Sequence, residues 1–190
     1  MPELSVDVVE RFCAILAIAA IVVMVVVAGL RLLAIGSDPA LDAYAALARL
    51  IQPRANVAGW LVAVLATAGS LYFSEVAGFA PCTLCWYQRI AMYPFVVLFG
   101  VAALRREVRP PTGASTLAAI GALIAAYHVA LEWIPSLDTG ACSAAVSCTF
   151  VWFRVFGIFS LPTLALTAFL LILTFTLVRD PDEPYPWSDR

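Results

Sequence analysis

Charged residues are scarce in this 190-residue chain, and lysine is absent. Only 13% of the residues are charged, and all eleven basic residues are arginines. The formal net charge is −2, so the excess of positive charge that accompanies nucleic-acid binding is missing. Apolar residues, by contrast, make up 63% of the chain, and the mean hydropathy is +0.96. This composition is typical of integral membrane proteins.

Five apolar segments approach or exceed the roughly 20 residues that a membrane-spanning helix needs. The first follows acidic residues and is too long for the apolar part of a signal peptide, so we expect it to be retained. No internal repeat and no second soluble domain is visible. The sequence therefore predicts an all-α integral membrane protein with spans at Phe12–Ile35, Val57–Phe73, Trp86–Leu104, Ser115–Ile134 and Val155–Val178.

Arginines indicate how the chain is oriented, because cytoplasmic connections carry an excess of positive charge. They cluster in alternate connections and after the last span, at Arg31, Arg49, Arg54, Arg105, Arg106, Arg109, Arg179 and Arg190. The first and third connections and the C-terminus are thus predicted to be cytoplasmic. The N-terminus and the second and fourth connections are predicted to lie on the extracytoplasmic side.

The connections differ in composition. Ser37-Asp38-Pro39 is typical of a helix start, and apolar residues then recur at helical spacing, so either a short interfacial helix or a simple linker follows. The fourth connection, residues 135–149, is rich in glycine, serine and alanine and is expected to be mobile. Residues 179–190 combine proline with charge, which predicts a disordered tail.

Four of the five cysteines form two close pairs in the extracytoplasmic connections, where disulfides persist. The first pair, Cys82 and Cys85, begins a span, with Pro81 suited to the first helical position. Free backbone N–H groups and the helix dipole stabilise a thiolate there. Arg89, on the same helical face as Cys85, favours the thiolate further. This C-x-x-C pair is predicted to be redox-active, and a static disulfide or chance pair is the alternative.

Two other cysteines form the second pair, and one is left over. The pair Cys142 and Cys148 lies in a connection expected to be mobile, so its disulfide is predicted to be exchangeable, with a loop staple as the alternative. Cys13 begins the first span and is expected to be an apolar packing residue.

Polar residues inside the spans are the remaining candidates for chemistry. Arg89 is expected to face a cavity, a ligand or a partner, although its side chain could instead reach the headgroups. His128 and Glu132 share one face of the fourth span. Since His128 lies at a depth similar to that of Arg89, it is predicted to line the same outer pocket and to handle protons, with a purely structural histidine as the alternative.

The run Pro81-Cys82-Thr83-Leu84-Cys85-Trp86-Tyr87-Gln88-Arg89-Ile90, followed by Cys142 and Cys148, resembles the disulfide bond formation protein B family, DsbB, including its Gram-positive BdbC-type members. The run Phe156-Gly157-Ile158-Phe159-Ser160-Leu161-Pro162-Thr163-Leu164 is also similar to the last helix of that family. The resemblance implies a four-helix transmembrane bundle over residues 57–178. Residues 1–56 add one N-terminal transmembrane helix and a cytoplasmic connection, and residues 179–190 form the tail.

The resemblance also implies an activity in the bacterial cell membrane. Members of this family reoxidise an extracytoplasmic thioredoxin-fold oxidase of the DsbA or BdbD type and pass the electrons to a membrane quinone, ubiquinone or menaquinone. Carried over to this chain, the reduced partner attacks Cys142, and Cys148 receives the oxidising equivalent from the Cys82–Cys85 disulfide. Cys85 and Arg89 then face the quinone. No metal site is expected.

Three features depart from the family pattern. The first is the extra N-terminal helix, which either docks a partner or packs on the bundle. The second is Gln88, where many relatives carry an acid. The third is the short spacing of the outer pair, which leaves open whether Cys142 or Cys148 is attacked. Other functional classes remain as alternatives. A vitamin K epoxide reductase-like enzyme is disfavoured because its loop cysteines precede the redox pair. A protein that binds or transports a metal through cysteines, and a structural protein with stapled loops, are the others.

Overall fold

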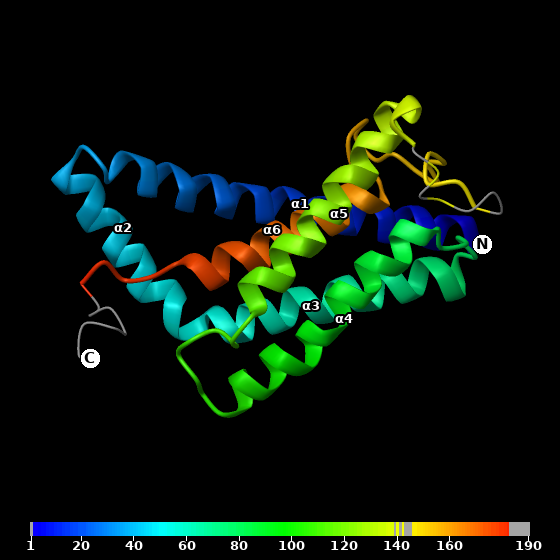
Figure 1. Ribbon diagram of the computed structural model, residues 1–190. Coiled ribbons are helices and arrows are strands. Elements are labelled where there is room, and N and C mark those ends of the chain that lie inside the picture. Colours follow the sequence, from blue (N-terminus) through cyan, green and yellow to red (C-terminus); the bar gives the residue numbers. More distant parts are fainter. Residues whose placement is uncertain (1, 139, 141, 143–145, 183–190) are drawn as a thin grey trace.

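The computed structural model describes residues 2–138, 140, 142 and 146–182. In this part of the chain the secondary structure is helical, and the one β-type pairing is an isolated bridge between Val155 and Phe159. The α-helices are α1 (Pro2–Leu33), α2 (Asp38–Ile51), α3 (Ala55–Leu71), α4 (Thr83–Leu104), α5 (Ala114–Trp133) and α6 (Leu161–Leu177) (Figure 1). Single short turns are 3₁₀-helical at Gln52–Arg54 and Pro135–Leu137 and π-helical at Tyr72–Val76. The predicted all-α class is confirmed.

Several of these helices can cross a membrane. Within the described residues, four helical stretches are long and apolar enough: Val6–Leu33, Asp38–Val76, Thr83–Leu104 and Ala114–Trp133. Helix α6 is also apolar but has only 17 residues. Many large apolar side chains on these helices are exposed, as expected where lipid rather than water is the surrounding solvent. The protein is therefore a multi-pass membrane protein with an N-terminal spanning helix.

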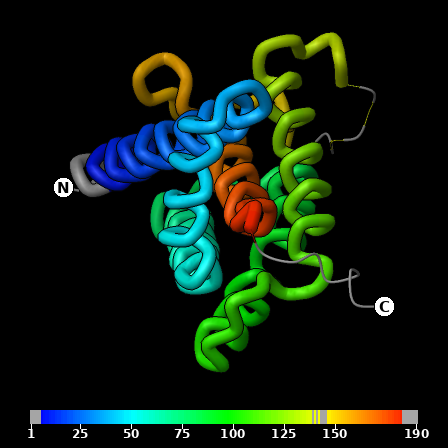
Figure 2. Tube along the Cα trace, turned by 90° about the vertical axis from the view of Figure 1, so that its left-hand side faces the viewer, coloured from blue at the N-terminus to red at the C-terminus, as the bar shows by residue number. Residues whose placement is uncertain are grey.

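Helix α6 lies at the centre of the bundle. It packs against α1, α3 and α5, and Figure 2 shows α1 and α5 on opposite sides of it. The core joins the rings of Phe95, Phe99 and Phe169 to small residues of α5, among them Ala118 and Ala122. These small side chains let α5 approach α6 closely, which is the usual basis of helix packing in lipid.

The first connection contains a true helix. Helix α2 begins after Ser37 and buries Tyr44, Ala45 and Ala48. Tyr44 and Ala48 belong to one cluster with Val27 of α1. Of the two alternatives for this segment, the structure supports the helix. The α1–α2 hairpin packs on the bundle, since α1 contacts α6.

The last helix begins later than its apolar run predicts. Phe156 and Gly157 both have positive φ, 52° and 74°, and Ile158 N–H donates to the Val155 carbonyl, so the chain turns back in a tight hairpin. Ser160 then caps α6, and its N–H donates to Thr163 Oγ1. The prediction that the helix starts at Val155 is therefore wrong. Turn and cap residues interrupt the apolar run, and the helix begins only after the cap.

The two predictions of disorder concern segments that are only partly described. Residues 139, 141, 143–145 and 183–190 lie outside the described residues. The start of the tail is held: Arg49 of α2 pairs with Asp180 at 3.8 Å and Asp182 at 3.4 Å, and Asp180 N–H donates to Gln52 Oε1.

The ends of the bundle carry different features. The α3–α4 and α5–α6 connections, which hold the two cysteine pairs, lie at the end where α1 begins (Figure 1). Helix α2 and the α4–α5 connection lie at the opposite end. Both cysteine pairs therefore lie at the same end of the bundle.

Close packing of α5 on α6 makes a test of the fold. A Cβ added at Gly121 would collide with the ring of the fully buried Phe169. Gly121→Ala is expected to destabilise the protein by about 1–3 kcal/mol, the usual range for overpacking, measured as a lower unfolding temperature in detergent. Phe169→Leu should restore most of the loss in the double variant. Gly29→Ala, where a Cβ meets nothing within 4 Å, is the control, and an equal effect there would contradict the packing.

Candidate functional site

The first cysteine pair forms the start of α4. Cys82 is the N-cap, and its sulfur accepts a hydrogen bond from the Cys85 backbone N–H at 3.2 Å. The two sulfurs lie 2.7 Å apart as free thiols. Pro81, predicted at the first helical position, instead precedes the cap. The correction follows from the cysteine itself, because a sulfur that accepts a backbone N–H can serve as the cap.

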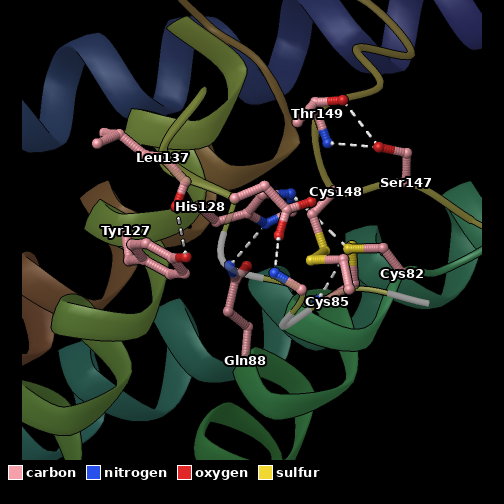
Figure 3. The surroundings of a disulfide bond; sticks show 12 residues. Cys82, Cys85, Gln88, Tyr127, His128, Leu137, Ser147, Cys148 and Thr149 are labelled. Atoms are coloured by element: carbon pink, nitrogen blue, oxygen red, sulfur yellow. Dashed lines mark hydrogen bonds between the residues drawn. A yellow bond between two sulfur atoms is a disulfide. The ribbon is translucent and has the colours of Figure 1, made fainter. Parts of the chain in front are cut away.

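The second cysteine pair packs directly on the first. Cys142 and Cys148 form a disulfide with a Cα–Cα distance of 5.8 Å, and all four cysteines belong to one cluster with Leu84 and Leu131 of the bundle. Figure 3 shows Cys148 beside Cys82 and Cys85. Cys148 is 0% exposed, whereas Cys142 is half-buried. An outside thiolate can thus reach Cys142 more easily than Cys148.

A histidine contacts the same sulfur pair from α5. The Gln88 amide nitrogen lies 3.0 Å from His128 Nδ1. Because an amide N–H₂ only donates, Nδ1 accepts, and the ring proton is on Nε2. Nε2 lies 3.7 Å from Cys82 Sγ, so His128 points its N–H at that sulfur (Figure 3).

These contacts change the acidity of Cys82, which precedes the span of α4. Donation from the Cys85 thiol, reinforced by His128 and opposed by burial, lowers the pKa of Cys82 to about 4. In the reduced pair, Cys82 is therefore a thiolate at neutral pH.

His128 does not share a pocket with Arg89, contrary to the prediction. It lies behind the sulfur pair, together with Glu132. The Glu132 carboxylate accepts from Ser160 Oγ and pairs with Arg154 at 3.8 Å. The helical spacing correctly placed His128 and Glu132 on one face, but the rotation of α5 in the bundle turns that face toward Cys82.

Arg89 joins α4 to α3 inside the bundle. Its Nε donates to Ser70 Oγ at 2.9 Å and its Nη2 to the Ser70 carbonyl at 2.8 Å. The guanidinium also lies over the Trp86 ring, 5.3 Å from the centroid. Nη1 has no hydrogen-bond partner among the described residues. Arg89 is thus fixed by α3, and one edge of its guanidinium keeps donor capacity.

A cavity of about 410 Å³ lies between α1, α3, α4 and α6. Cys85, Gln88 and Arg89 line its outer part with Ser70 and Ser74, and the rest of its lining is mostly apolar. Cys82 lines a separate small hollow shared with His128. Cys85 lines this hollow as well, so Cys85 borders both spaces, whereas Cys82 borders only the hollow that contains His128.

Aromatic rings cover the outer end of this cavity. Phe79 stacks on Phe73 at 5.7 Å and on Trp152 at 4.7 Å between centroids, and all three rings line the cavity. Phe150 packs edge-on against Trp152. Trp152 belongs to this cover.

Some residues of the site were not predicted. Ser70 has a detectable signal, because a buried arginine requires partners and few polar side chains occur in the Val57–Phe73 run. Tyr93 lines the cavity, and its buried hydroxyl lacks a hydrogen-bond partner within the described structure. The lining by α1 had no signal in the sequence, since it depends on where α1 packs.

Comparison with known proteins identifies the family. The profile described as "Disulfide bond formation protein DsbB" matches residues 52–179. The chain belongs to the DsbB family. This membership supports the oxidation of thiols to disulfides at a membrane, and it accounts for two cysteine pairs packed in one cluster.

Named relatives of this DsbB-family chain include proteins of Bacillus and Oceanobacillus. It is 42% identical over 119 residues to the disulfide bond formation protein C of Bacillus subtilis (strain 168), covering 62% of this chain and 86% of the relative. It is 41% identical over 128 residues to a probable disulfide formation protein C 1 of Bacillus cereus, covering 67% and 92%. A probable disulfide formation protein of Oceanobacillus iheyensis is 40% identical over 121 residues, covering 63% and 83%. No solved structure matches.

The low pKa of Cys82 gives a pH test. In a background of Cys13→Ser, Cys142→Ser and Cys148→Ser, alkylation of Cys82 should persist until the pH falls through about 4. Cys85→Ala removes the main donor to the thiolate, so the midpoint should rise by about one to two units, the value of one hydrogen bond to a charged group. Cys85→Ser keeps a donor, and its midpoint should stay low. Equal midpoints for the two variants would contradict the assignment.

Proposed function

We propose that this protein reoxidises an extracytoplasmic thioredoxin-fold oxidase of the DsbA or BdbD type and passes the electrons to a membrane quinone. One observation carries the proposal: an accessible disulfide packs on a second cysteine pair, and Cys85 of that pair opens into an apolar cavity that holds a buried arginine. Such a site connects protein thiols on one side with a lipid-soluble acceptor on the other.

The outer disulfide receives the electrons first. The thiolate of the reduced oxidase attacks Cys142 Sγ, the Cys142–Cys148 bond breaks, and the second thiol of the oxidase then displaces Cys142, so the oxidase leaves as a disulfide. The half-burial of Cys142 and the full burial of Cys148 support this order. The electron pair now resides on the outer dithiol.

The inner pair then reoxidises the outer one. Cys148, released as a thiolate, attacks Cys82 of the Cys82–Cys85 disulfide and frees Cys85. Cys142 closes back onto Cys148 and releases Cys82. The shared cluster of the four sulfurs supports this exchange, since no large movement is needed to bring the pairs together.

Closure of the inner disulfide completes the cycle. Cys85 faces the cavity, and the Cys82 thiolate lies 2.7 Å away, ready to bond to it. Two electrons and the Cys85 proton leave the pair as the Cys82–Cys85 bond forms. These electrons and two protons would pass to a bound quinone, and the second of the protons is the one already lost when Cys82 became a thiolate. The Nε2–H of His128 keeps Cys82 deprotonated for this step, and Gln88 keeps the proton on that nitrogen. We thus assign His128 a positioning role toward Cys82.

The residues of the cavity fit a quinone. A quinone ring is apolar on its faces and carries carbonyl oxygens that accept hydrogen bonds. The cavity has apolar walls, and it is lined by two side chains with donor capacity left over, Arg89 and Tyr93. The buried hydroxyl of Tyr93 in particular calls for a partner. These residues would hold the ring, although they do not distinguish ubiquinone from menaquinone.

The proposed membrane orientation follows from the arginines. The end of the bundle with both cysteine pairs is assigned to the extracytoplasmic side of a bacterial cell membrane, and the end with α2 and Arg105 to the cytoplasm. Residues 57–178 form the catalytic domain in this proposal, and residues 1–56 form an added element.

One observation favours metal binding as a second function. Ligand atoms of Cys82, Cys85 and His128 lie within 4.8 Å of one another. However, the two sulfurs are 2.7 Å apart, whereas tetrahedral zinc separates two thiolates by about 3.8 Å, from its Zn–S distance. The geometry therefore suits exchange between thiol and disulfide better than ligation.

The proposed function predicts a requirement for quinone. Oxidised protein is mixed anaerobically with an excess of reduced thioredoxin-fold oxidase. Oxidation of the partner should stop once both cysteine pairs of the protein are reduced, and added quinone should restore turnover. Arg89→Ala should raise the KM for quinone by about 10- to 100-fold, the value of one hydrogen bond from a charged group. The single-turnover reaction of the outer disulfide should not change.

Arg105→Ala, in which an exposed arginine is lost, is the matched control and should keep the quinone KM. Metal content and free thiols are measured on the same preparation. Sustained turnover without quinone, or bound zinc with blocked thiols, would refute the proposal.

The site of attack by the partner is testable separately. An oxidase variant that keeps only its attacking cysteine should stall as a mixed disulfide with the oxidised protein. Peptide mapping by mass spectrometry is expected to find that bond at Cys142, because Cys148 is fully buried. A mixed disulfide mainly at Cys148 would reverse the assignment of the two outer cysteines.

A further inference from the structure

Helix α1 lies outside the region that matches the family. That region, residues 52–179, excludes α1 and α2, and the aligned parts cover 83 to 92% of the three relatives named above. Helix α1 is therefore an element that this chain has in addition to the region it shares with the family.

Helix α1 is held away from α3 and α4. It packs on α6 and on the hairpin before it, where Ala14 and Ala17 contact Phe159, Val155 and Leu164. The space left between α1 and the α3–α4 pair is part of the 410 Å³ cavity. Six residues of α1 line it: Cys13, Leu16, Ala17, Ala19, Ala20 and Val23. Three of the six are alanines, which leave room for a ligand.

The lining residues of α1 run from the polar part of the cavity into its apolar part. A Cβ added at Gly69 would lie 3.9 Å from Cys13 Sγ, and the next residue, Ser70, holds Arg89. Cys13 is thus level with the guanidinium. Val23 lies about 15 Å farther along the helix, from its rise per residue, and Leu16, Ala17 and Ala20 lie between.

We propose that α1 forms one wall of the quinone site, with Cys13 beside the ring and the alanine-rich face along the isoprenoid tail. This inference rests on the proposed function and adds a helix to the binding site. The ligand is an elongated quinone, because the cavity combines donors at one end with an apolar lining that continues for about 15 Å along α1. A lipid acyl chain would have no use for the buried donors Arg89 and Tyr93.

The chain provides its own reporter for this wall. When both cysteine pairs are oxidised, Cys13 is the one remaining thiol of the five cysteines. The oxidised protein in lipid nanodiscs is treated with a membrane-permeant maleimide, with and without a short-tailed ubiquinone or menaquinone analogue. The ring of the analogue is fully substituted so that it does not itself alkylate thiols. At ten times its Kd, alkylation of Cys13 should slow about tenfold by mass action.

Two matched variants test which face of α1 borders the quinone. Cys13→Ser should abolish labelling. Val22→Cys in that background places the thiol on the exposed face of α1, and quinone should not protect it. The proposal would be overturned if quinone left Cys13 unprotected or protected both positions equally. It would also be overturned if added phospholipid or alkane protected Cys13 as well as quinone does.

A third variant tests the wall by filling it. Ala20→Phe should raise the KM for quinone by roughly five- to 100-fold, the range that overpacking produces, and should weaken quinone protection of Cys13. Val22→Phe on the lipid face should do neither. Single-turnover reaction with reduced oxidase, which needs no quinone, reports whether each variant is folded.

The outcomes separate the two proposals. If turnover requires quinone but Cys13 is not protected, α1 is not part of the site and the proposed function stands. If turnover does not require quinone, the proposed function fails and the inference about α1 fails with it.

Discussion

A guanidinium in the apolar part of a membrane must find its hydrogen-bond partners inside the protein. Arg89 meets this demand through the hydroxyl and the carbonyl of Ser70. The two bonds join α3 to α4 close to the start of α4, where the cysteine pair lies. They also keep the side chain inside the bundle, although it lies near enough to the helix start to reach headgroups instead. The cavity has a polar part because Ser70 of α3 holds the guanidinium of Arg89 at its lining.

The cysteine pair at the start of α4 connects two environments. Both cysteines border the hollow that contains His128, and only Cys85 also borders the large cavity. Helix geometry brings the two sulfurs together, because a cap residue and the residue three positions later lie on the same face of the first turn, and Cys85 lies farther into the bundle than Cys82. Burial lets a few donors control which sulfur carries the charge, since each hydrogen bond is stronger where water is excluded. Cys82 itself is only 4% exposed.

Much of this arrangement could be predicted from local patterns. The long apolar runs predict the helices, and the C-x-x-C motif followed by an arginine marks the centre of the site. The start of α6 was misplaced because apolar content alone cannot separate a hairpin from a helix, although Gly157, Ser160 and Pro162 mark the boundary. The pocket of His128 was misplaced for a different reason. Helical periodicity gives the relative orientation of His128 and Glu132 but not the rotation of α5 against α4.

The sequence by itself determined the helical class, the membrane setting, the pairing of the cysteines by position and the presence of a buried arginine, because each depends on composition or on spacing along one helix. Only the tertiary structure decided that Ser70 holds Arg89, that His128 contacts Cys82 rather than the large cavity, and that α1 lines that cavity. These features depend on how separate helices pack. In lipid, packing is governed by small-residue contacts and polar partners spread over distant parts of the chain, and no short stretch of sequence contains both sides of such a contact.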